Sequence, residues 1–128
     1  VDLRVAVEPV PHADLFGEVD GREASATVAM RVGRARAAAA ERWSASGWRL
    51  NGEVPGSALR HRPLRLPRAA LRQAEAYLDR GQLSVRGFDR VLRMAWTVAD
   101  LQGHAVPDAG DVAEAMFFRL GWDESWAA

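Results

Sequence analysis

The sequence has 128 residues, a formal net charge of zero and no cysteine. A chain of this length fits one domain, which can bury roughly two-thirds of the surface exposed by the unfolded chain. The lack of cysteine excludes disulfides and cysteine-based zinc or redox sites, and no apolar run approaches the ~20 residues of a membrane span. No basic segment followed by an apolar one opens the sequence, so we expect a cytoplasmic protein without membrane contact.

All 17 basic residues are arginine, and they are balanced by 17 acidic residues. A neutral total gives no overall attraction to nucleic acid. Any binding of nucleic acid would therefore depend on local patches of arginine.

Residues 1 to 10 alternate between apolar and polar side chains, the pattern of a short strand that Pro9 and Pro11 would end. A lone strand has no partner for its backbone groups, so we expect residues 1 to about 20 to be frayed or loosely packed. Residues 11 to 23 mix prolines, glycines and acids, which indicates a linker.

Ser25 is expected to cap a helix that ends near Trp43 to Ser46, before Gly47. Gly33 inside this helix costs about 1 kcal/mol relative to alanine, so packing must supply its stability. Apolar spacing predicts a buried face made of Val28, Val32, Ala35 and Ala39. The arginines that project elsewhere are Arg31, Arg34, Arg36 and Arg42.

Residues 48 to 62 contain the turn signals Asn-Gly and Pro-Gly, and we expect a loop with one short helix around Ser57 to Arg60. Pro67 lies near the first turn of the next predicted helix, and Gly81 ends that helix. The apolar face of this helix is expected to contain Leu71, Ala74, Tyr77 and Leu78.

Ser84 leads into the strongly amphipathic stretch that ends at Leu101, which predicts the central helix of the fold. Its apolar face consists of Phe88, Val91, Leu92, Ala95, Val98 and Ala99. The opposite face carries Arg86, Arg90, Arg93 and Thr97. Such a helix can be held by its apolar face while it presents arginines to an anionic group.

Gly103 and Pro107 end the central helix, and Asp108 or Asp111 can cap a last one. Its inward residues are expected to be Val112, Ala115, Met116 and Leu120. The sequence therefore predicts an all-α fold, a small bundle of about four main helices. We expect an extended segment at 1–20, a helical domain at 21–120 and a tail at 121–128.

The central stretch resembles a motif of magnesium-chelatase-like AAA+ ATPases of the ComM/YifB type. The matching residues are Leu83, Ser84, Arg86, Arg90, Val91, Leu92, Arg93, Ala95, Thr97, Ala99, Asp100 and Leu101. The helix at 25–43, the run from Leu50 to Gly56 and the first strand-like residues are similar to further segments of that family. The resemblance covers nearly all of residues 1 to 120 and implies the C-terminal lid domain of such an ATPase.

The resemblance also implies that Arg86 is the second-sensor arginine of the lid, which approaches the phosphates of ATP at a subunit interface. Arg90 lies on the same face of the predicted helix and is a further candidate for binding the nucleotide. ATP and Mg²⁺ would belong to the whole protein only, and the isolated chain is expected to bind no cofactor. The implied partners are an upstream AAA+ core and neighbouring subunits of a ring, expected to be hexameric. The whole protein is expected to act on DNA in transformation or recombination.

Arginine suits phosphate because its planar guanidinium donates two parallel hydrogen bonds and stays charged at any working pH. Periodicity alone favours another interpretation, in which Arg86 is a surface residue paired with Asp89 or Asp100. The resemblance favours the sensor. Asp100 is then interpreted as the structural partner of some other arginine.

A helical DNA-binding or protein-docking module that uses its arginine faces is the alternative function. The candidate nucleic-acid residues are Arg93, Arg31 and Arg34, although such flanks are more often solvated or bonded to acids. Aromatic side chains that could stack on bases are Trp43, Trp48, Trp96 and Phe117, but their helical context favours packing.

No set of residues in the sequence supports catalysis. There is no G-x-x-x-x-G-K-[ST] loop and no apolar strand ending in magnesium-binding acids, so we expect no ATP hydrolysis by this chain alone. His12, His61 and His104 lack the spacing of metal ligands, and no metal site is expected. The carboxylates form no recognisable pair for acid–base chemistry.

Overall fold

The computed structural model describes residues 2–17 and 21–121, and all regular structure within them is helical. The α-helices are α1 (His12–Phe16), α2 (Ser25–Trp43), α3 (Gly56–Arg60), α4 (Arg68–Asp79), α5 (Val85–Gln102) and α6 (Ala109–Leu120). Two short 3-10 helices, η1 (Ser44–Ser46) and η2 (Asn51–Glu53), follow α2. The all-α prediction is confirmed. None of the described helices combines the length and hydropathy needed to cross a bilayer.

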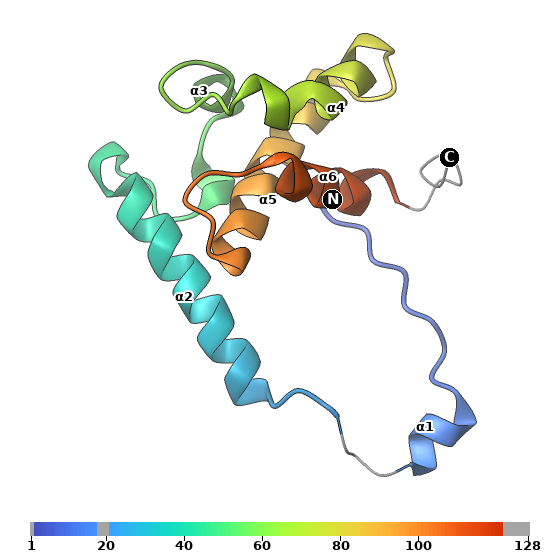
Figure 1. The fold of residues 1–128 in the computed structure, drawn as a ribbon. Coiled ribbons are helices and arrows are strands. Elements are labelled where there is room, and N and C mark those ends of the chain that lie inside the picture. The colour runs from blue at the N-terminus through green and yellow to red at the C-terminus, as the bar shows by residue number, and fades with distance from the viewer. Residues whose placement is uncertain (1, 18–20, 122–128) are drawn as a thin grey trace.

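Helix α5 is the centre of the fold, and α2, α3, α4 and α6 pack around it (Figure 1). Its start is capped as predicted, because Ser84 Oγ accepts the backbone N–H of Gly87 at 3.0 Å. It ends at Gly103, whose φ of +80° lies in the left-handed region that glycine adopts without strain. The predicted apolar face is confirmed, since each of its members is buried: Phe88, Val91, Leu92, Ala95, Val98 and Ala99.

Helices α4 and α6 complete the core on α5. Their buried residues include Leu71, Ala74, Val112, Ala115 and Met116, whereas Tyr77, Leu78 and Leu120 are half-buried. Both acids that the sequence offers as caps of α6 are used. Asp108 Oδ1 accepts the N–H of Asp111 at 3.0 Å, and Asp111 Oδ2 accepts the N–H of Asp108 at 2.9 Å. This reciprocal capping box fixes the first turn of α6.

Helix α2 packs on α5 through its C-terminal half. Ala35, Ala39 and Trp43 are buried, whereas Val28 and Val32 are 38% and 37% exposed. The N-terminal half of α2 projects away from the bundle (Figure 1). The prediction of a buried face that includes Val28 and Val32 was therefore wrong, because apolar spacing shows which residues share a face and not how far a neighbouring helix extends.

The N-terminal segment lies on the outside of the bundle. Residues 2–17 are all exposed, and the predicted strand does not form. Within the described ranges no second strand can pair with it, and the N–H of Arg4 instead donates to the carbonyl of Phe118 at 2.8 Å. The predicted linker contains the short helix α1, none of whose residues is buried.

Two boundary predictions have different outcomes. Ser25 does not cap α2, because Ala24 occupies the N-cap position and Ser25 is the first helical residue, without a side-chain cap hydrogen bond. The end of α2 is confirmed, since η1 follows Trp43 and leads to Gly47 with a φ of +77°. Of the expected tail, all but Gly121 lies outside the described residues.

The short helix predicted around Ser57 to Arg60 is confirmed as α3, and a glycine lets it approach α5. A Cβ added to Gly56 would lie 2.1 Å from both Cγ and Oδ2 of Asp89, and 2.7 Å from its Cβ. The Asp89 carboxylate is also ion-paired to Arg60 of α3. The absence of a side chain at Gly56 therefore permits this contact between the two helices.

We expect Gly56→Ala to destabilise the chain by about 1–3 kcal/mol, because the new methyl must displace Asp89 from Arg60. Gly33→Ala is the matched control, since a Cβ there meets nothing within 4 Å and the change should stabilise α2 by about 0.5–1 kcal/mol. Urea unfolding followed by tryptophan fluorescence measures both. Equal stabilities for the two variants would contradict the close approach at Gly56.

Candidate functional site

Arg86 lies in the first turn of α5, and its side chain is exposed. Its neighbours Gly87 and Phe88 are buried, and Ser84 caps the helix just before it. The backbone that carries Arg86 is therefore held in place from both sides. Within residues 2–17 and 21–121, no carboxylate forms an ion pair with Arg86.

The two acids that could have paired with Arg86 are occupied by other arginines. Asp89 is ion-paired to Arg60, and both carboxylate oxygens of Asp100 accept hydrogen bonds from Arg42. The interpretation of Arg86 as a surface residue paired with one of these acids was therefore wrong. The prediction that Asp100 serves as the structural partner of another arginine is confirmed.

A hollow of about 260 Å³ opens beside the first turn of α5. Its lining includes Ser84 and Gly87 of this end of α5, Arg4 of the first segment and Arg119 of α6. The free N–H groups of a helix N-terminus give this end of α5 a partial positive charge. Sequence reasoning did not find Arg4 and Arg119, because only packing brings the first segment and α6 to the start of α5.

The remaining residues of the α5 arginine row contact other parts of the fold. Arg90 Nε lies 2.9 Å from Asp2 Oδ1, and Arg93 Nε donates to the carbonyl oxygen of Val54 at 2.8 Å. The Thr97 hydroxyl accepts a hydrogen bond at 3.1 Å from Nδ2 of Asn51, the first residue of η2. We expected the whole arginine face of α5 to be exposed. Arg86 is exposed, whereas Arg90, Arg93 and Thr97 are half-buried.

The side-chain amide of Asn51, 9% exposed, joins α2, η2 and α5. Its Oδ1 accepts hydrogen bonds from Trp43 Nε1 at 2.9 Å and from Arg42 Nη1 at 3.3 Å. Its Nδ2 donates to Asp100 Oδ2 at 2.9 Å and to Thr97 Oγ1 at 3.1 Å. Both donors and both acceptor positions of the amide are therefore used.

Arg42 completes this network from the last turns of α2. Its guanidinium carbon lies 4.4 Å from the ring centroid of Trp96 and 5.4 Å from that of Trp43. The two buried rings pack edge to face, with centroids 5.5 Å apart. The prediction that these tryptophans pack between helices is confirmed. We call the five residues Arg42, Trp43, Asn51, Thr97 and Asp100 the Asn51 network.

Sequence reasoning missed the role of Asn51. An Asn-Gly pair is a turn signal, and η2 does begin at Asn51. The one available hint was the run from Leu50 to Gly56 in the family resemblance. Local sequence could not show that the amide is buried, because its partners lie on two other helices. Those on α5, Thr97 and Asp100, follow Asn51 by 46 and 49 residues.

The arginines considered for nucleic acid do not form one surface. Arg31 is ion-paired to Glu23 at 2.7 Å, and Arg34 is exposed, and both belong to α2. Arg93 lies against Val54 on α5. The structure therefore does not bring these three candidates together.

A second polar cluster lies at the start of α6. His104 Nδ1 is 2.8 Å from Asp111 Oδ2 and 3.8 Å from Asp108 Oδ2. The hydrogen bond to Asp111 raises the pKa of His104, and the backbone N–H of Asp111 lowers the pKa of Asp108. Three such groups within 4.8 Å could approach a cation, but both carboxylates already form the capping box. We therefore interpret the cluster as a helix cap.

These features define a small all-α domain whose central helix presents an exposed arginine from its first turn. The family model described as magnesium chelatase, subunit ChlI C-terminal, matches residues 22–119. The chain belongs to this family of C-terminal lid domains.

Three curated relatives are uncharacterized mycobacterial proteins: Mb2921c of Mycobacterium bovis, and MT2965 and Rv2897c of Mycobacterium tuberculosis. Each is 47% identical over 119 residues, which is 93% of this chain. The chain spans 23% of the length of these relatives. No solved structure matches the chain significantly.

We expect Asn51→Ala to lower the free energy of unfolding by about 2–4 kcal/mol, because it leaves the buried Nε1 of Trp43 without its partner and removes one of the two hydrogen bonds that Asp100 Oδ2 accepts. Gln102→Ala is the control, since its amide bonds Glu114 at an exposed position and its loss should cost within about 0.5 kcal/mol. Urea unfolding measures both. A loss at Asn51 no larger than at Gln102 would show that the Asn51 network contributes little.

The raised pKa of His104 predicts a pH-dependent contribution to stability. The contribution is fully present below the unfolded pKa of about 6.5 and is lost as the pH rises through the folded value. His104→Gln keeps a hydrogen-bond donor but cannot titrate, so it should be more destabilising at about pH 5.5 than at about pH 8.5. Thermal unfolding at both values tests this, and an equal loss would contradict the charged interaction with Asp111.

Proposed function

We propose that this chain is the ATP-responsive lid of a magnesium-chelatase-like AAA+ ATPase of the ComM/YifB type, with Arg86 as its second-sensor arginine. The observation that carries this proposal is the position of Arg86. It is exposed in the first turn of a helix whose other face is buried, and no described carboxylate pairs with it. An arginine held in this way is prepared to bind an anion that another part of the assembly supplies.

Phosphate is the anion that fits this end of α5. A guanidinium donates parallel hydrogen bonds to phosphate oxygens, and the helix N-terminus adds partial positive charge. Arg4 in the lining of the adjacent hollow adds positive charge near this end of the helix. The described residues that line the hollow include no carboxylate, so Mg²⁺ bound to ATP would be held by the nucleotide-binding core and not by these residues.

The Asn51 network could couple the binding of phosphate at Arg86 to a movement of other helices. It ties α2 and η2 to α5, so a displacement of Arg86 would move these elements together. Closure of a lid around a nucleotide completes a catalytic site and can be converted into movement between subunits. We propose that the whole protein forms a cytoplasmic ring, expected to be hexameric, which uses this movement on DNA in transformation or recombination.

Arg86→Ala in the whole protein should lower ATP turnover by about 10³-fold or more, the size of effect that transition-state arginines show. The isolated variant chain should unfold at the wild-type temperature, because Arg86 is exposed and makes no ion pair within the described residues. Arg34→Ala, which removes an exposed arginine of α2, is the control and should turn over ATP normally. Turnover of Arg86→Ala within a few-fold of wild type would remove the sensor assignment.

A further inference from the structure

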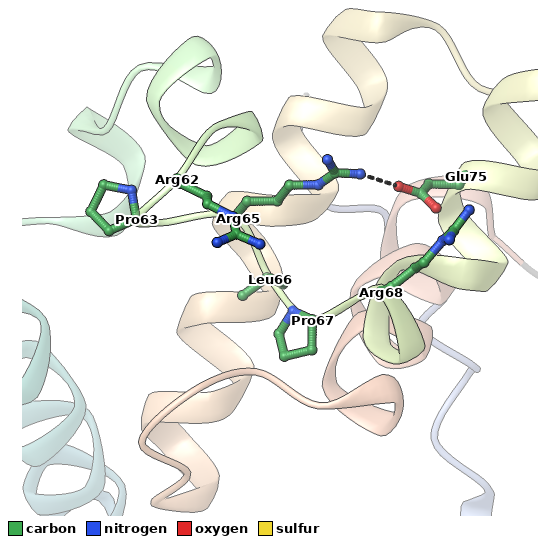
Figure 2. Close-up of a pocket in the computed structure, with 7 residues that line it drawn as sticks. All are labelled: Arg62, Pro63, Arg65, Leu66, Pro67, Arg68 and Glu75. Carbon is green, nitrogen blue, oxygen red and sulfur yellow. Dashed lines mark hydrogen bonds and ion pairs between the residues drawn. The ribbon is translucent and has the colours of Figure 1, made fainter.

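A wide hollow of about 910 Å³ lies over the connection from α3 to α4, and arginines form much of its wall. Figure 2 shows Arg65 bonded to Glu75, with Arg62 and Arg68 around the same hollow. A neighbouring hollow of about 470 Å³ shares Arg68 and Glu75 and adds Arg72. We call Arg62, Arg65, Arg68 and Arg72 the α3–α4 arginine surface.

The backbone under this surface is fixed by the core. Leu66 is 4% exposed, and Pro67 holds the N-cap position of α4. Arg68 and Arg72 are four residues apart, so they lie on one face of α4, and Leu71 is buried on another. The guanidinium groups therefore extend from a rigid support into solvent.

The charge on this surface is unbalanced. The linings of the two hollows contain four arginines and one carboxylate, Glu75, which leaves an excess of three positive charges. Arg65 is bonded to Glu75 at 3.3 Å, and its side chain is 52% exposed, so this ion pair contributes little stability although the two charges cancel. No ion pair of Arg62, Arg68 or Arg72 is present in the part of the chain that the structure describes.

Several other arginines of the chain are neutralised locally. Arg31, Arg42, Arg60 and Arg90 each have a carboxylate partner, and the total charge of the chain is zero. The α3–α4 arginine surface is therefore a local concentration of charge within a neutral protein. A surface of this kind attracts an extended anion more than a small one, because its charges are spread over residues 62 to 72.

We propose that the α3–α4 arginine surface binds the phosphate backbone of a nucleic acid. Guanidinium groups pair with backbone phosphates and stay ionised, and such contacts position a strand without reading its sequence. Among the described residues, the linings include no aromatic side chain on which a base could stack, so the proposed contact is to phosphate and not to bases. The choice of DNA as the partner rests on the proposed function of the whole protein. The residues of the α3–α4 arginine surface do not include Arg86.

The test is fluorescence anisotropy of the chain with a labelled duplex of about 20 base pairs, and with one of its single strands, between about 50 and 200 mM salt. We expect dissociation constants below about 100 μM at the lowest salt. The triple variant Arg62→Gln/Arg68→Gln/Arg72→Gln should lower the slope of log K against log salt by about 2.7 for duplex, or about 2 for a single strand.

The matched control is Arg22→Gln/Arg34→Gln/Arg36→Gln, which removes three exposed arginines outside the surface. It should change the slope by less than about one unit. Circular dichroism shows whether each variant remains folded. The form, duplex or single strand, whose slope change comes closer to its expected value identifies which form the surface binds.

Three results would overturn the proposal: no DNA binding below about 100 μM, equal losses in the two triple variants, or binding of poly-glutamate as tight as that of DNA. The last result would indicate an acidic protein as the partner. Arg86→Ala should bind DNA like the wild type. Failure of this proposal would leave the ATP-turnover result for Arg86 unaffected, so the two assignments can fail separately.

Discussion

The arrangement of this domain depends on the hydrogen bonds made by the buried amide of Asn51. The N-terminal half of α2 projects into solvent, so α2 is held by its C-terminal half, which ends at Trp43. There the amide bonds Trp43 of α2 and Asp100 of α5 at 2.9 Å each. A buried amide with every donor and acceptor used tolerates few other geometries, which fixes how α2 and η2 lie on the central helix.

Other arginines occupy the two acids that were considered as partners of Arg86. Arg42 is held by Asp100 within the Asn51 network, and Arg60 is held by Asp89 in a separate contact between α3 and α5. Arg93 is bonded to the backbone of the same loop that carries Asn51. Arg86 therefore remains exposed while these neighbouring arginines are used to hold the helices together.

The chain has a net charge of zero, but its charged side chains are unevenly distributed over the surface. Many arginines are used inside the fold as hydrogen-bond donors, which suits a planar group with five N–H bonds. Other arginines are exposed, among them Arg86 in the first turn of α5 and those of the α3–α4 arginine surface. They lie on different elements, so a nucleotide and a nucleic-acid strand could contact the lid at separate places.

The sequence by itself determined the helices α4, α5 and α6, the cap at Ser84, the caps of α6 and the apolar face of α5. These depend on spacing and on groups within a few residues of one another, which local sequence encodes. The tertiary structure alone decided that Asn51 is buried, that Val28 and Val32 are not, and that residues 2–11 form no strand. It also decided the partner of each arginine, because a partner depends on where distant segments of the chain meet.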